Sequence, residues 1–382
     1  MKLVPPPAAR VGDALSAVAT PSLLIDLDAF DANLAAMAAF VARNGVALRP
    51  HAKAHKSSAI ARRQIEAGGA GVCCQKLSEA YPFAAAGVES IHISNEFVGA
   101  DKVAMAVELA AHVRLSVCAD AIPQLEALGA AALRAGVKID VLAEVDAGQR
   151  RCGVTSEDAL LSLADAIAAQ PALQFAGIQA YHGGAQHIAD WQARKTEAGR
   201  AADRAAHFVR TLEARGIQSA IVTGGGTGTV EFDVASGVYT EVQPGSYVFM
   251  DGDYGSLAYD GELQWRHSLF VLSTIMSAAR PGMAVCDVGL KGLAVDSGLP
   301  RSVHWLDAAD EPVLTYSAAN DEHGMLNAKG APHDDTSALL GKRILLPPGH
   351  CDPTVNLYDE YVCYRGEQVV DIWSIDARGL SR

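Results

Sequence analysis

The chain has 382 residues, half of them hydrophobic, which is enough to bury the core of two or three domains, or of one barrel with an added part. Asp and Glu outnumber Lys and Arg by 44 to 31, and the net charge of −13 argues against nucleic acid or an anionic membrane surface as a partner. No apolar run has the length of a membrane helix, and prolines near the N-terminus interrupt any secretory signal. Seven cysteines at irregular spacing predict reduced thiols in a cytoplasmic protein.

From residue 22 to about residue 250, short apolar β-prone runs alternate with Ala-rich stretches whose apolar residues recur every three or four positions. There are eight such runs: SLLIDL from Ser22, VALRPHAK from Val46, GVCCQ from Gly71, SIHIS from Ser90, RLSVCA from Arg114, KIDVLAEV from Lys138, QFAGIQAYH from Gln174 and SAIVTGGG from Ser219. Eight strand–helix repeats predict a closed (β/α)8 barrel, with a doubly wound open sheet as the alternative.

The pattern changes after about residue 262, where short strands separated by Gly, Pro, Asp and Asn replace the helical periodicity. This pattern of short strands and turn residues predicts a compact all-β domain. We therefore expect a barrel over residues 22–262 and a β-domain over residues 263–382, with residues 1–21 packed against the latter.

Unusual polar sequences follow four of the predicted barrel strands, at the strand ends where barrel enzymes carry their functional residues. After the second strand, alternation would place Arg49, His51 and Lys53 on one face, where desolvation and like charge would lower the pKa of the lysine and make it an amine nucleophile. A solvated basic strand end is the alternative. After the sixth strand, Arg150 or Arg151 could donate to a cofactor nitrogen or an anion, unless the loop carries only paired surface charges.

Two Gly-bearing loops follow the seventh and eighth strands. The segment YHGGAQH, from Tyr181 to His187, suits proton transfer, although a structural histidine fits equally well. The segment TGGGTG from Thr223 allows backbone N–H groups to approach a phosphate, at the usual phosphate position of these barrels, or it forms a tight turn. It has neither the Walker ending nor the GxGxxG spacing.

In the β-domain, His350 and Asp352 are two residues apart and would point the same way on an extended segment. One imidazole and one carboxylate suit a divalent ion such as Mn²⁺ or Mg²⁺, although H-x-D is frequent by chance. Asp321-Glu322-His323-Gly324 is a second polar cluster. A desolvated lysine and a phosphate loop at one barrel mouth together would hold a phosphorylated aldehyde, and pyridoxal 5′-phosphate (PLP) fits that description.

The whole chain resembles the D-threonine aldolase family, the metal-dependent branch of the alanine-racemase-like PLP enzymes that includes the 3-hydroxy-D-aspartate aldolases and, more distantly, the D-serine dehydratases. The resemblance is carried in order by RPHAKAHK, GVCCQK, EVD-x-GQ-x-RCGV, QAYHG, TGGGTG-x-VEFD, GSY-x-FMD-x-DYG, DEHG and HCDPT-x-N. It implies a TIM-type barrel plus a β-domain, paired as a homodimer whose active sites receive residues from the partner.

The resemblance also implies a role for individual residues. Lys53 matches the lysine that bonds to PLP, Arg151 the residue facing the pyridine nitrogen, and His187 the histidine near the substrate hydroxyl. His350 and Asp352 match the metal pair, for which Mn²⁺ is expected and Mg²⁺ or Co²⁺ would serve. The remaining cofactor-binding positions are Gln75, Tyr181, Gly225, Gly226, Thr227 and Tyr247.

The implied activity is metal-dependent cleavage of D-β-hydroxy-α-amino acids of the D-threonine type to glycine and an aldehyde. One alternative is a 3-hydroxy-D-aspartate aldolase giving glycine and glyoxylate, and another is a D-serine or D-hydroxyaspartate dehydratase. Dehydratase relatives resemble H-x-C at the metal pair, and Asp352 at that position favours a harder ion and aldol cleavage. A PLP carrier without catalysis would lack the β-domain, and a racemase would need a second acid–base group opposite Lys53.

Overall fold

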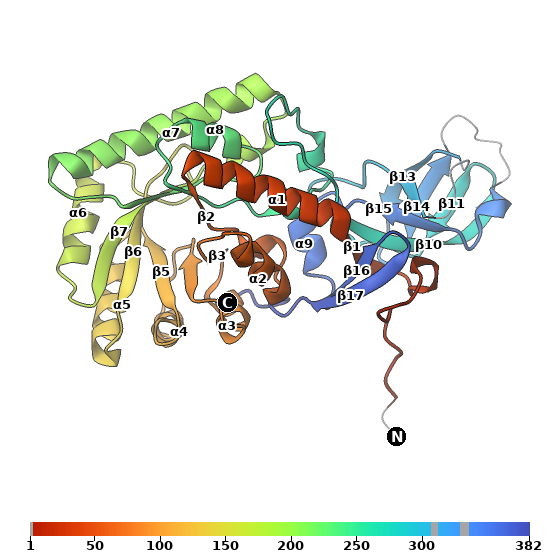
Figure 1. The fold of residues 1–382 in the computed structure, drawn as a ribbon, viewed down its shortest axis with the longest axis horizontal. Helices are drawn as coiled ribbons and strands as arrows, with labels where there is room; N and C mark the ends of the chain where they lie inside the picture. Colours follow the sequence, from red (N-terminus) through yellow and green to blue (C-terminus); the bar gives the residue numbers. More distant parts are fainter. Residues whose placement is uncertain (1–2, 307–311, 329–335) are drawn as a thin grey trace. The chain divides into compact units, whose positions relative to one another are not determined.

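The computed structural model describes residues 3–306, 312–328 and 336–382, and the chain divides into two compact units (Figure 1). We call residues 34–247, 257–264 and 379–382 the barrel unit. The β unit consists of residues 1–33, 248–256 and 265–378. Among the described residues, no helix combines the length and apolar character that crossing a membrane requires.

Eight parallel strands form the sheet of the barrel unit, in the order β2-β9-β8-β7-β6-β5-β4-β3. A parallel bridge between His51, just after β2, and Cys73 in β3 joins the two ends of this order. The predicted (β/α)8 barrel is therefore confirmed. Its strands are β2 (Ala47–Leu48), β3 (Val72–Cys74), β4 (Ser90–Ile93), β5 (Arg114–Ala119), β6 (Ile139–Glu144), β7 (Leu173–Ala180), β8 (Ile221–Gly224) and β9 (Glu241–Val242).

Amphipathic helices alternate with these strands, and α6 (Glu157–Ala168) shows why they form. The Ser156 hydroxyl accepts a hydrogen bond from the Ala159 N–H at 3.3 Å and so caps the first turn. Apolar residues at helical spacing, from Leu160 to Ile167, are buried along one face. The other helices are α1 (Leu27–Asn44), α2 (Ser58–Glu66), α3 (Leu77–Ala85), α4 (Ala100–Ala110), α5 (Ile122–Ala135), α7 (Trp191–Ala214) and α8 (Val230–Ala235).

The β unit contains a mixed sheet in the order β13-β14-β11-β10-β1-β16-β17, with β15 pairing β10 and β12. Its strands are β1 (Ser22–Asp26), β10 (Leu269–Arg280), β11 (Met283–Cys286), β12 (His304–Trp305), β13 (Leu314–Ala319), β14 (Gly324–Ala328), β15 (Arg343–Leu346), β16 (Glu360–Arg365) and β17 (Gln368–Ser374). A short helix, α9 (Cys351–Val355), lies between β15 and β16.

One strand differs from the sequence prediction. The run beginning at Ser22, expected as the first barrel strand, is β1, which pairs antiparallel with β10 and parallel with β16. An apolar run of this length has the same pattern in either sheet, and only its hydrogen-bonding partners decide which sheet it joins. The eighth strand of the barrel is instead β9. It was not predicted because it has only two residues, the first of which is Glu241, and so shows no apolar run.

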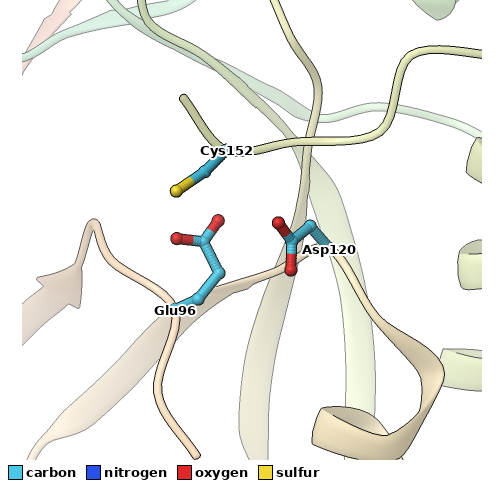
Figure 2. A group of neighbouring side chains, drawn as sticks. All are labelled: Glu96, Asp120 and Cys152. Atoms are coloured by element: carbon cyan, nitrogen blue, oxygen red, sulfur yellow. The ribbon is translucent and has the colours of Figure 1, made fainter. Parts of the chain in front are cut away.

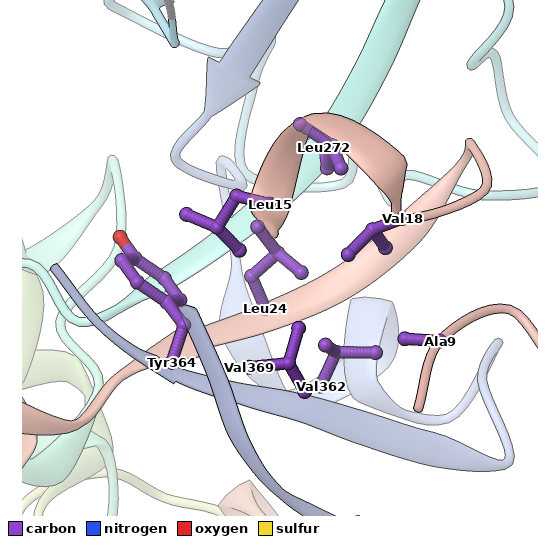
Figure 3. Packing of buried hydrophobic residues seen from close by; sticks show 8 residues of the cluster. All are labelled: Ala9, Leu15, Val18, Leu24, Leu272, Val362, Tyr364 and Val369. Atoms are coloured by element: carbon purple, nitrogen blue, oxygen red, sulfur yellow. The ribbon is translucent and has the colours of Figure 1, made fainter. Parts of the chain in front are cut away.

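The N-terminal segment contributes to the core of the β unit. Leu24 of β1 is fully buried against Leu272 of β10 and Val362 of β16 (Figure 3). Ala9, Leu15 and Val18 pack onto the same cluster together with Tyr364 and Val369. Burying an aliphatic side chain of this size contributes about 1.5–3 kcal/mol, so the segment from Ala9 to Leu24 helps to stabilise the β unit.

Candidate active site

The interior of the barrel is hydrogen-bonded rather than purely apolar. His92 of β4 bonds through Nε2 to the Oε1 of Gln179 in β7 at 2.9 Å, and since β4 and β7 are not neighbours in the sheet, this contact crosses the interior. The same network continues through Gln243 Nε2 to Gln179 Oε1 (3.2 Å), Gln243 Nε2 to Thr223 Oγ1 (2.9 Å), Thr223 Oγ1 to Glu241 Oε1 (2.9 Å) and Arg49 Nε to Glu241 Oε2 (2.9 Å). Each side chain of this network thereby has a hydrogen-bond partner, which offsets the cost of burying it.

The segment after β2 carries Lys53 but does not continue as a strand. Lys53 lies in the 3₁₀ turn η2 (Ala52–Ala54), so the expected placement of Arg49, His51 and Lys53 on one face of a strand is wrong. A buried carboxylate neutralises each of two neighbouring cations, Glu241 for Arg49 and Glu79 for Lys56. The Lys53 side chain is half-buried at the C-terminal end of the barrel strands, where the sequence placed it.

The Gly-rich loop directly follows β8, as predicted. Gly225 has a φ of +70°, which favours glycine, and a Cβ atom at Gly226 would lie 2.6 Å from Gln186 Oε1. Gln186 Oε1 also accepts the Gly228 N–H at 3.0 Å and braces the loop. The hydroxyl of Thr227 is buried and has no hydrogen-bond partner among the described residues. A phosphate oxygen would satisfy this hydroxyl.

The loop after β6 is held in place by carboxylates. Asp146 accepts the N–H groups of Gly148 and Arg150 at 2.8 and 3.0 Å, and Asp120 accepts the Gly153 N–H at 3.1 Å. This fixes the backbone on both sides of Arg151, whose guanidinium lies 5.6 Å from the ring centroid of Tyr181. The structure thus brings together two of the residues that the sequence assigned to the cofactor.

Four further residues at this end of the barrel were not singled out from the sequence. Ligand atoms of Glu96, Asp120 and Cys152 lie within 4.8 Å of one another, a grouping that could hold a metal ion (Figure 2). Burial, and then the neighbouring carboxylate of Glu96, raise the pKa of Glu144 to about 9. The same two causes raise the pKa of the Cys152 thiol to about 11. Because Glu96, Asp120 and Glu144 each lie at or just after a predicted strand end, the strand-end rule could have found them.

The other predicted barrel residues have different environments. Tyr247 is fully buried, its hydroxyl accepts a hydrogen bond from Gln64 Nε2 at 3.2 Å, and burial raises its pKa. Gln75 follows β3 and is half-buried, while its N–H donates to Glu79 Oε2 at 2.9 Å. His187 ends the 3₁₀ turn η3 (Gly183–His187) and is exposed.

In the β unit, His350 is extended, whereas Asp352 belongs to the first turn of α9. The expectation that both lie on one extended segment is therefore wrong. The start of α9 is fixed by Asp251, whose carboxylate accepts the Cys351 N–H at 2.8 Å. His350 Nδ1 lies 2.6 Å from Asp296 Oδ2. The imidazole and the carboxylates are nitrogen and oxygen donors of the kind that Mn²⁺ and Mg²⁺ accept.

Comparisons with known proteins agree with this architecture. The family model for the alanine racemase N-terminal domain matches residues 25–253, and the model for a putative serine dehydratase domain matches residues 268–364. The chain is 50% identical to a D-threonine aldolase of Arthrobacter sp, covering 99% of this chain and 97% of that protein. It is 39% identical to a 3-hydroxy-D-aspartate aldolase of Paracoccus denitrificans (strain Pd 1222), covering 95% and 93%. The crystal structure of a D-threonine aldolase from Filomicrobium marinum superposes with a TM-score of 0.91 at 42% identity, covering 98% of this chain and 99% of that one.

Proposed function

We propose that this chain, which belongs to the D-threonine aldolase family of alanine-racemase-like proteins, cleaves D-β-hydroxy-α-amino acids to glycine and an aldehyde. It is an aldehyde lyase in this proposal, and D-threonine is its model substrate. The full-length identity of 50% to a D-threonine aldolase is the observation that carries the assignment.

The barrel unit fits PLP, the cofactor expected for this family. The unpartnered Thr227 hydroxyl and the glycine positions 225 and 226 would hold the phosphate, and Lys53 would supply the amine that bonds to the aldehyde. Arg151 would face the ring nitrogen. The other sides of the cofactor would be lined by Gln75, Tyr181 and Tyr247. PLP, when bound, supplies a ring that accepts the electrons left on Cα when a bond to it breaks.

The chain's own residues then account for the proton movements. His187 accepts the proton of the β-hydroxyl while the Cα–Cβ bond breaks. The β-carbon then leaves as an aldehyde, and the electron pair of the broken bond stays on Cα. A proton returned to Cα, for which Lys53 is the candidate donor, completes glycine. Arg151 would donate a hydrogen bond to the ring nitrogen without transferring a proton to it, since an arginine side chain does not act as an acid in proteins.

The β unit supplies the proposed metal site. His350 and Asp352 would hold a divalent ion, Mn²⁺ in first place, and Mg²⁺ or Co²⁺ as substitutes. Such an ion supplies Lewis acidity toward a hydroxyl group. Asp352 in place of a soft thiolate favours this harder ion and supports aldol cleavage over the dehydratase alternative.

Two finer points belong to the same proposal. The chain is also similar to a 3-hydroxy-D-aspartate aldolase, so cleavage of 3-hydroxy-D-aspartate to glycine and glyoxylate is the alternative to cleavage of D-threonine as the preferred reaction. We also propose a homodimer with shared active sites.

Glycine release from purified protein tests the function. Samples contain PLP and Mn²⁺ with D-threonine, D-3-hydroxyaspartate or their L-isomers, each with and without EDTA, and Lys53→Ala is the control. We expect glycine from the D-isomers only, lost with EDTA and in the variant, and the faster substrate identifies the preferred β-substituent. Release of a 2-oxo acid and ammonia in place of glycine would instead assign the protein to the dehydratases.

A further inference from the structure

A carboxylate outside the proposed metal pair contacts the metal-binding histidine directly. Asp296 Oδ2 lies 2.6 Å from Nδ1 of His350, which is a short hydrogen bond between imidazole and carboxylate. A carboxylate oxygen accepts hydrogen bonds, so the Nδ1–H group is the donor in this contact, and the lone pair of the neutral ring then lies on Nε2. The contact therefore selects which nitrogen of His350 faces a metal ion.

The segment that carries Asp296 is fixed to the segment that carries His350. The Ala294 N–H donates to the Thr354 hydroxyl at 3.2 Å, and that hydroxyl donates to the backbone oxygen of His350 at 2.8 Å. On the other side of Asp296, Gly298 approaches Gly349 so closely that a side chain at Gly349 would meet the Gly298 oxygen at 2.1 Å. Asp296 is thus held from both sides at the position where its carboxylate reaches the imidazole.

The exposure of the pair indicates what it does. The side chains of Asp296 and His350 are 53% and 26% exposed, and ion pairs that are open to water contribute little to the stability of a fold. Two hydrogen bonds of the Thr354 hydroxyl and a close glycine–glycine approach nevertheless specify their geometry. The arrangement is explained if the Asp296 carboxylate serves to orient the imidazole, because a carboxylate partner fixes the ring plane of a metal-binding histidine and raises its basicity.

We propose that Asp296 is a positioning residue for the metal site, which holds the His350 ring so that Nε2 binds the divalent ion. The inference rests on the proposed function, because it takes His350 and Asp352 as the metal pair. It adds to this pair a third residue, an aspartate contributed by a segment more than fifty positions earlier in the chain.

Mn²⁺ affinity of the PLP-loaded protein tests the proposal without any reading of activity. Titration with Mn²⁺, with free ion followed by electron paramagnetic resonance, should show binding about 10- to 100-fold weaker for Asp296→Ala. Asp296→Asn should recover part of this loss, because its amide oxygen still accepts the Nδ1 proton. Thermal unfolding of both variants without metal should match the unaltered protein.

Three further variants separate the outcomes. Asp359→Asn removes an exposed carboxylate paired with Arg378 in the same unit and should leave the Mn²⁺ affinity unchanged. If His350→Ala and Asp352→Ala abolish binding but Asp296→Ala does not weaken it, the positioning role is refuted and the metal pair stands. If Asp296→Asn loses as much affinity as His350→Ala, Asp296 is itself a ligand and the proposal is overturned. If His350→Ala and Asp352→Ala both retain the affinity, the metal pair of the proposed function fails as well.

Discussion

Glu144 is a carboxyl group that its surroundings keep protonated near neutral pH. It ends β6, is 5% exposed and accepts a hydrogen bond from Gln179 Nε2 at 2.9 Å. Burial is the main cause of its raised pKa, and the negative charge of Glu96 adds to it, while Arg151 acts in the opposite direction. A proton on Glu144 avoids a second negative charge directly beside the Glu96 carboxylate.

The raised pKa makes the stability of the protein depend on pH. Between the ordinary value of 4.5 and about 9, the folded protein retains a proton on Glu144 that the unfolded chain has released, so rising pH favours unfolding in this window. Glu144→Gln keeps the hydrogen bond with Gln179 but cannot titrate. As the pH rises from 5 to 9, we expect the free energy of unfolding, measured with urea, to fall less for the variant than for the unaltered protein.

The matched control for this experiment is Glu126→Gln, which changes an exposed carboxylate on α5. Its unfolding curve should follow that of the unaltered protein at every pH. Parallel pH profiles for Glu144→Gln and the unaltered protein would show that Glu144 is ionised in the folded state.

Individual residues were predictable where one rule applied to each of them. The rule that functional groups follow barrel strands placed Lys53, Arg151, Tyr181 and the Gly225 loop at the same strand ends as the structure does. A different rule, the alternation of side chains along an extended segment, was used for His350 and Asp352, and it failed because a helix begins between them. The Asp296 contact was not predictable, since it joins positions far apart in the chain.

At the scale of elements, β7 and β8 come unusually close at Gly177. This glycine has a φ of +149°, and a Cβ atom there would lie 1.8 Å from the carbonyl oxygen of Ile221. The pairing of β7 with β6 shifts register at the same place, between Val141 and Leu142. Glycine is therefore required for the close packing of two barrel strands that end at the proposed site.

Gly177→Ala should destabilise the protein by at least about 1–3 kcal/mol, because the strained φ and the steric clash act together. Gly199→Ala on α7 is the control, since apart from its chain neighbours and the backbone of its own helix no described atom lies within 4 Å of its Cβ position. In a helix interior that change should stabilise the protein by about 0.5–1 kcal/mol. Denaturant unfolding measures both, and equal effects of the two substitutions would refute the argument.

Elements were predictable from periodicity, but their partners were not. The helices and most of the strands lie where apolar spacing placed them, since that spacing reflects which face is buried. β1 was assigned to the wrong sheet because its partners, β10 and β16, lie more than two hundred residues later. β9 was missed because a two-residue strand with a buried glutamate gives no apolar pattern.

At the scale of the whole molecule, each unit is assembled from separate stretches of the chain. Residues 1–33 and 248–256 group with the β unit although barrel sequence lies between them, so a single boundary near residue 262 describes the division only in part. A change in composition marks where one pattern of predicted helices and strands gives way to another. It does not show that an N-terminal strand pairs with strands of a C-terminal sheet. That information lies in the pairing of β1 with β10 and β16.

The division into units predicts that cofactor and metal binding can be removed separately. Lys53 and the phosphate loop belong to the barrel unit, whereas His350, Asp352 and Asp296 belong to the β unit, and each set is held by contacts within its own unit. Lys53→Ala should therefore lose the visible absorption band of covalently held PLP after dialysis but retain Mn²⁺ affinity. The double variant His350→Ala/Asp352→Ala should retain the band and lose Mn²⁺ binding, and both should lack glycine release. Loss of Mn²⁺ affinity in Lys53→Ala would contradict this separation and would mean that the metal site depends on the bound cofactor.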